Sequence, residues 1–109
     1  MRLFPAVVVL LAPAIAAMPA AAATPAAMAQ GFADAAAACR TASDLRDAAV
    51  VGAPILFSDT AGKTALLVTG RWRPAHMKGA RATMLCLYDR TSRRAEAQEA
   101  PGWTARTRR

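Results

Sequence analysis

The chain has 109 residues, is 55% hydrophobic and carries a formal net charge of +7, so it is long enough for one small domain and too short for a multidomain enzyme. It contains no Gly-rich phosphate loop, dinucleotide-binding fingerprint or Cys/His metal spacing, so no motif predicts a cofactor. The positive charge favours an anionic partner. Twelve of the fourteen basic residues are Arg, however, and thirty residues are Ala, so a GC-rich genome explains the basicity equally well.

Residues 1–29 have the features of a secretory signal peptide. Arg2 supplies a short positive start, an apolar run follows to about Ile15, and no further charge occurs before Asp34. The preferred cleavage site lies between Ala29 and Gln30, and a second small-residue site precedes Thr24. An uncleaved membrane anchor is the main alternative, and a faint lipobox before Cys39 is a weaker one. We therefore expect export to the periplasm or beyond, with only transient membrane contact.

The remaining chain is predicted to form one domain over residues 30–103, followed by a basic flexible tail at 104–109. Its two cysteines, Cys39 and Cys86, allow one intramolecular pairing, and an exported protein meets an oxidising compartment. A disulfide is therefore expected, because a core this small benefits from a covalent link. A reactive thiol pair and a metal-ligand role are the alternatives.

An Ala-rich segment from Gly31 to about Ala42 predicts a helix. Five residues at helical spacing predict its buried face, namely Phe32, Ala35, Ala36, Cys39 and Ala42. Continuing the helix would bring Arg46 onto that face, so we expect a kink or break within residues 41–44. Ser43 then resembles the N-cap of a second short helix over residues 43–50.

After Gly52 the pattern changes from helix to strand. Residues 54–59 and 64–72 are apolar and β-branched runs around a short Gly-containing loop, which predicts a hairpin. Residues 82–89 predict a third strand, and the alternation over residues 94–100 predicts an edge strand. The sequence thus predicts an α+β fold, with one helix packed on a four-stranded antiparallel meander.

Alternation places Met84, Cys86 and Tyr88 on the strand face toward the helix. Leu85 and Leu87 then lie on the other face, which a single helix cannot cover. An uncovered apolar face predicts an interaction site, with a dimer among the assemblies it allows. The alternative is that Trp103 and the C-terminal segment, or strong coiling of the sheet itself, cover that face.

The loop between the second and third strands combines basic and aromatic side chains. Arginine forks bind phosphate or carboxylate oxygens, and an indole ring can stack beneath such a group. The candidate residues for anion or partner binding are Arg71, Trp72, Arg73, His76, Lys78 and Arg81. An ordinary solvated loop is the alternative, because exposed basic side chains are usually only hydrated.

Metal binding and catalysis have less support. His76 and Met77 are potential Cu(I) ligands, because Cu(I) prefers soft ligands such as the methionine thioether. Together with Met84 they are the only His and Met residues after residue 29. Ser58, Asp59 and His76 include the residue types of a hydrolase triad but lack a nucleophile elbow. Glu96 and Glu99 would lie on opposite faces of a regular strand, which does not suit paired acid and base chemistry.

We therefore predict a small exported protein that acts by binding rather than as an enzyme. Its expected partner is an envelope protein or an anionic envelope polymer, reached through the apolar sheet face and the loop over residues 71–81. Binding of a small ligand or copper through His76 and Met77 is the second hypothesis. Nucleic acid is not expected as a partner, because export separates the protein from it.

Overall fold

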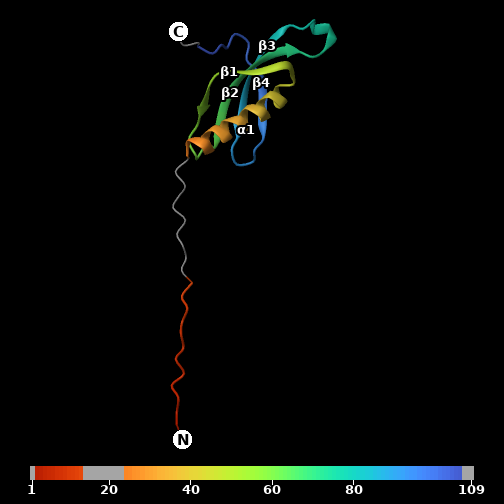
Figure 1. Ribbon diagram of the computed structural model, residues 1–109. Coiled ribbons are helices and arrows are strands. Elements are labelled where there is room, and N and C mark those ends of the chain that lie inside the picture. The colour runs from red at the N-terminus through yellow and green to blue at the C-terminus, as the bar shows by residue number, and fades with distance from the viewer. Residues whose placement is uncertain (1, 14–23, 107–109) are drawn as a thin grey trace.

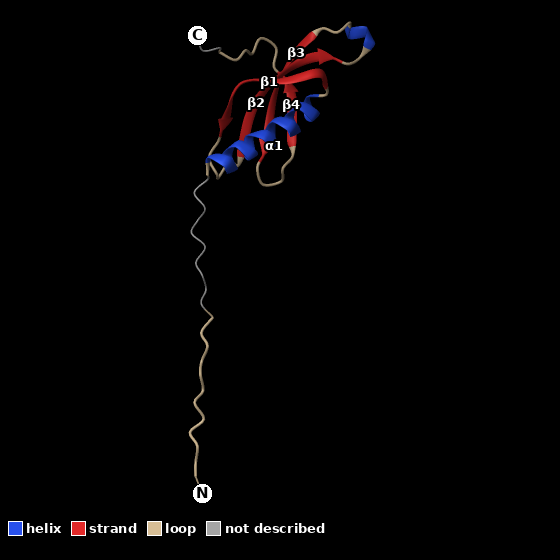
Figure 2. Ribbon diagram, in the orientation of Figure 1, coloured by secondary structure: helices blue, strands red, loops and turns tan. Residues whose placement is uncertain are grey.

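The computed structural model describes residues 2–13 and 24–106 and confirms the predicted α+β fold. One helix lies across one face of a four-stranded antiparallel sheet with strand order β1-β2-β3-β4 (Figure 1). The elements are α1 (Pro25–Ser43), β1 (Leu45–Leu56), β2 (Lys63–Trp72), the 3-10 helix η1 (Ala75–Met77), β3 (Arg81–Asp89) and β4 (Ala95–Glu99). Figure 2 shows η1 at the tip of the β2–β3 hairpin, away from α1.

Helix α1 begins six residues earlier than the sequence pattern predicts, at Pro25 rather than Gly31, and ends where a break is expected. Pro25 occupies the first turn, and the Thr24 side chain accepts a hydrogen bond from the Ala27 backbone N–H at 3.1 Å. This is a favourable N-terminus, because proline lacks a donor there and threonine satisfies one free N–H. At the other end, Asp44 adopts the left-handed conformation with φ of 51° and terminates the helix.

The predicted second helix over residues 43–50 is wrong, because strand β1 occupies this segment. Ser43 does not cap a new helix; its hydroxyl donates to the Arg40 carbonyl within α1 at 2.7 Å. The β-branched residues Val50 and Val51 pair with Val68 and Leu67 of β2. Pairing with β2 outweighs the helix propensity of Ala48 and Ala49, which precede the two valines. The first strand therefore begins nine residues before the predicted start at Pro54.

The core lies between the C-terminal half of α1 and the sheet. The predicted disulfide between Cys39 and Cys86 is present and links α1 to β3, with the two Cα atoms 5.8 Å apart. Met84, Cys86 and Tyr88 face α1 and are buried, which confirms the predicted orientation of β3. Of the helix residues, only Ala35, Cys39 and Ser43 are buried, so the N-terminal half of α1 packs less closely against the sheet.

The predicted signal peptide falls partly outside the described residues. Residues 2–13 contain no helix or strand and are exposed, while residues 1 and 14–23 lie outside the description. Among the described residues, no helix combines the length and hydropathy needed to span a membrane.

Candidate anion-binding face

Three arginines occupy directly paired positions on three neighbouring strands. Arg46 of β1 pairs with Arg71 of β2, and Arg71 pairs with Arg81 of β3. Directly paired residues of antiparallel strands project from the same face, about 5 Å apart. All three side chains are exposed. We call this set the arginine row, and it lies on the outer face of the sheet, opposite α1.

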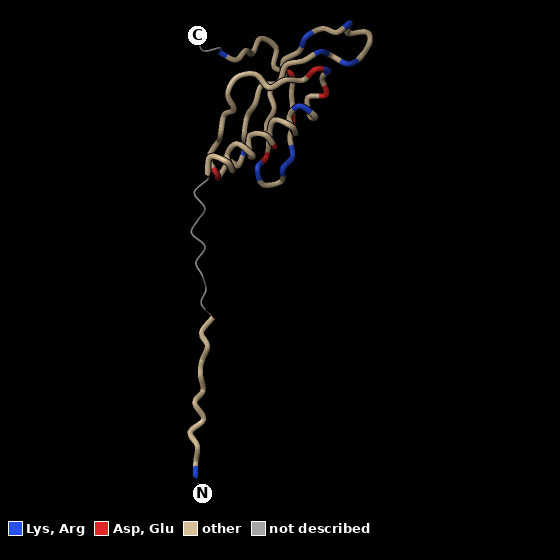
Figure 3. Tube along the Cα trace, viewed as in Figure 1, with Lys and Arg blue, Asp and Glu red and all other residues tan. Residues whose placement is uncertain are grey.

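Two of these guanidinium groups converge over the β2–β3 loop. Arg71 Nη1 donates to the Gly79 carbonyl at 3.0 Å, and Arg46 Nη2 lies 3.4 Å from the position that a β-carbon on Gly79 would take. In Figure 3, basic residues recur along the β2–β3 hairpin, which extends past the end of α1. Among residues 2–13 and 24–106, no carboxylate oxygen lies within 4.0 Å of a nitrogen of Arg46, Arg71 or Arg81. Their positive charges are therefore left for a ligand or solvent ions to balance.

At the opposite end of the outer face, by contrast, the charges are paired. Lys63 Nζ lies 2.7 Å from Asp89 Oδ2, and the backbone N–H groups of Ser92 and Thr91 donate to Asp89 Oδ1. The hydrogen bond from Lys63, together with those from Ser92 and Thr91, holds the pKa of the Asp89 carboxyl well below its usual range. The Lys63–Asp89 ion pair and the two backbone hydrogen bonds to Asp89 brace the turn between β3 and β4.

The structure distributes the six predicted binding residues over three places. Arg71 and Arg81 lie in the arginine row, whereas Trp72 packs against the core on the helix side. Arg73 is held on that side too, because its Nε lies 3.1 Å from Asp44 Oδ1. His76 and Lys78 are exposed at and beside η1, at the hairpin tip.

Sequence reasoning missed Arg46, because residues 43–50 were interpreted as a helix. Had residues 45–51 been interpreted as a strand, its pairing with the next strand would have placed Arg46 opposite Arg71. The two valines in this segment were the available indication of a strand.

The potential copper ligands lie in different environments. His76 is exposed and Met77 half-buried within η1, whereas Met84 belongs to the core. Within the described part of the chain, no group of three or more His, Cys, Asp or Glu side chains is placed to hold a metal ion. Copper binding through His76 and Met77 stays a prediction.

Ser58 and Asp59 lie in the loop before β2, whereas His76 follows the end of that strand. A ten-residue strand spans about 33 Å. The Ser58 hydroxyl instead accepts a hydrogen bond from the Ala61 backbone N–H. This separation does not suit a catalytic triad.

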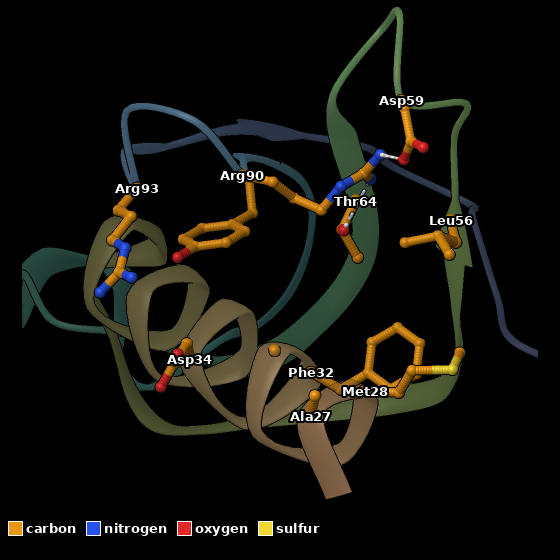
Figure 4. Close-up of a pocket in the computed structure, with 11 residues that line it drawn as sticks. Ala27, Met28, Phe32, Asp34, Leu56, Asp59, Thr64, Arg90 and Arg93 are labelled. Carbon is orange, nitrogen blue, oxygen red and sulfur yellow. Dashed lines mark hydrogen bonds and ion pairs between the residues drawn. The ribbon is translucent and has the colours of Figure 1, made fainter. Parts of the chain in front are cut away.

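A hollow of about 310 Å³ lies between the N-terminal half of α1 and one end of the sheet (Figure 4). Met28 and Phe32 of α1 lie toward Leu56 of β1 across this cleft. Arg90 points toward Thr64 and Asp59, and its guanidinium also donates to the carbonyls of three residues, Lys63, Phe57 and Ser58. Through these contacts Arg90 stabilises the loop between β1 and β2.

The chain was compared with protein-family models, with curated proteins and with solved structures, and none of them matches it.

Proposed function

We propose that this protein is an exported binding protein whose outer sheet face recognises an anionic component of the cell envelope. The observation that carries the proposal is the arginine row of Arg46, Arg71 and Arg81. Like charges placed directly opposite one another across strands destabilise a sheet. A multiply charged anion relieves this repulsion and receives charge-assisted hydrogen bonds from guanidinium groups.

Two features support export. A disulfide is stable in an oxidising compartment, and the Cys39–Cys86 bond links α1 to the middle strands of the sheet. The apolar N-terminal run after Arg2 has the composition of a signal peptide. The protein acts by binding, and its ligand is a soluble or polymer-attached anion of the envelope.

Binding is tested by titrating the oxidised protein with two soluble anions, tripolyphosphate and the tetrasaccharide of galacturonic acid, at low ionic strength by calorimetry. The double variant Arg46→Gln with Arg81→Gln is expected to weaken binding by at least roughly tenfold, because two charge-assisted contacts are lost. This pair leaves the Arg71 hydrogen bond to Gly79 in place.

The matched control is Arg93→Gln with Arg94→Gln, which removes the same charge from the exposed turn before β4. It is expected to retain affinity within about twofold, since distant exposed charges are screened. Equal losses in both double variants would show that net charge alone attracts the anion. Absence of binding to both anions would overturn the proposed function.

The start of α1 predicts where the signal peptide is removed. Cleavage after Ala29 would delete Thr24, Pro25 and the first helical turn, whereas cleavage after Ala23 keeps the cap intact. Loss of a threonine cap costs about 1 kcal/mol. We therefore expect the exported protein to begin at Thr24, as measured by intact mass and N-terminal sequencing of protein from a periplasmic extract. An N-terminus at Gln30 would contradict this expectation.

A further inference from the structure

The C-terminal segment of residues 103–106, here called the strap, lies against the outer face of the sheet. Trp103 N–H donates to the Ala100 carbonyl at 3.2 Å and so turns the chain after β4. Ala105 then packs against β1 at Gly52 so closely that a β-carbon on Gly52 would lie 2.6 Å from the Ala105 β-carbon. The strap and the sheet together line two open hollows of about 260 and 280 Å³.

The hollow of about 280 Å³ lies between the strap and the part of β2 and β3 that leads to the arginine row. Its lining includes Thr69 and Thr83, which pair directly across β2 and β3. The next pair on the same face is Arg71 and Arg81, about 7 Å further along the strands. No hydrogen bond joins either threonine hydroxyl to another described residue. Both hydroxyls are therefore free to donate to and accept from a ligand.

The strap contributes an aromatic ring and a further positive charge to the same groove. Trp103 lines both hollows, and 56% of its surface is exposed. Arg106 lines both hollows as well. This part of the outer face therefore offers an exposed indole, two paired hydroxyls, the guanidinium of Arg106 and, one same-face pair beyond the hydroxyls, the arginine row.

We propose, as an extension that rests on the proposed anion-binding function, that this groove binds an acidic oligosaccharide. The C–H face of a sugar ring packs on the indole of Trp103, and sugar hydroxyls exchange hydrogen bonds with Thr69 and Thr83. Carboxylate or phosphate groups on neighbouring sugars then bind the arginine row through guanidinium forks. A polymer of phosphate alone would bind the arginines but would make no contact with the indole of Trp103.

Three probes separate sugar recognition from general anion binding. The oxidised protein is titrated with the tetrasaccharide of galacturonic acid, with maltotetraose as the neutral sugar and with tripolyphosphate as the non-sugar anion. We expect the acidic sugar to bind more tightly than either of the other two and to change the tryptophan fluorescence. Trp103→Ala is expected to weaken binding of the acidic sugar by roughly tenfold and binding of tripolyphosphate by less than about twofold.

A second variant tests the strap without changing any group that contacts the ligand. Gly52→Ala introduces a β-carbon that displaces Ala105, whereas Gly62→Ala introduces one whose nearest neighbour lies at 3.7 Å. Both glycines have positive φ, 73° and 65°, so the two variants share the same backbone strain. Only Gly52→Ala is expected to weaken binding of the acidic sugar, with folding of both variants checked by circular dichroism.

The outcomes distinguish this inference from the proposed function. Binding of tripolyphosphate with equal or weaker binding of the acidic sugar would overturn sugar recognition and leave anion binding standing. Unchanged affinity of both Trp103→Ala and Gly52→Ala for the acidic sugar would also overturn it. Failure of both anions to bind would overturn both proposals.

Discussion

Replacing both cysteines, Cys39→Ala with Cys86→Ala, is expected to lower the free energy of unfolding by about 3–4 kcal/mol. The disulfide joins two residues that are 47 positions apart in the sequence. In the chain-entropy account, closing a loop of this length lowers the conformational entropy of the unfolded chain and so stabilises the folded state. Noncovalent packing of α1 cannot replace much of this stabilisation, because the other buried residues of the helix are Ala35 and Ser43. Side chains this small bury little apolar surface.

The effect is measured by urea denaturation of the oxidised wild type, the reduced wild type and the double variant. Agreement between the reduced wild type and the double variant would assign the loss to the cross-link rather than to the missing sulfur atoms. A variant within about 1 kcal/mol of the oxidised protein would contradict the prediction and show that noncovalent contacts hold α1 on the sheet. The proposed anion affinity should survive in any variant that stays folded, since the arginine row does not contact the disulfide.

The fold was largely predictable because its strongest patterns are local. The helix face through Ala35 and Cys39 and the alternation through Met84, Cys86 and Tyr88 both hold in the structure. Joining the two by a disulfide fixed which face of the sheet the helix covers. The segment that failed, residues 45–51, contains alanines whose helix propensity competes with pairing to β2. Propensity cannot resolve such a segment, because the decisive interactions come from residues some twenty positions away.

The candidate site was only partly predictable for the same reason. Sequence reasoning gathered Arg71 and Arg81 because they flank one loop, but also included Trp72 and Arg73, which face the helix side. Arg46 joins the row through strand register, and Trp103 joins the groove through the path of the strap. Register and chain path are properties of the assembled sheet, so no short motif reveals them.

Substituting Gly70→Ala is expected to destabilise the protein by about 1–3 kcal/mol through overpacking. Gly70 is buried on the helix side of β2, close to the first two residues of the neighbouring strand β1. An added β-carbon would lie 2.7 Å from the Arg46 carbonyl oxygen and 2.7 Å from the Leu45 β-carbon. The backbone of β1 must move to admit it, because neither contact is the flexible end of a side chain.

The same movement should reach the outer face, which makes this variant a test of how the fold builds the site. Displacing the backbone at Arg46 disturbs its pairing with Arg71, so the affinity for tripolyphosphate should fall together with stability. Gly31→Ala is the matched control, because no atom lies within 4 Å of its added β-carbon on the exposed face of α1. It should stabilise the protein by about 0.5–1 kcal/mol and leave affinity unchanged. Urea denaturation and calorimetry measure both quantities. A stable Gly70→Ala variant with full affinity would show that β1 can shift without loosening the arginine row.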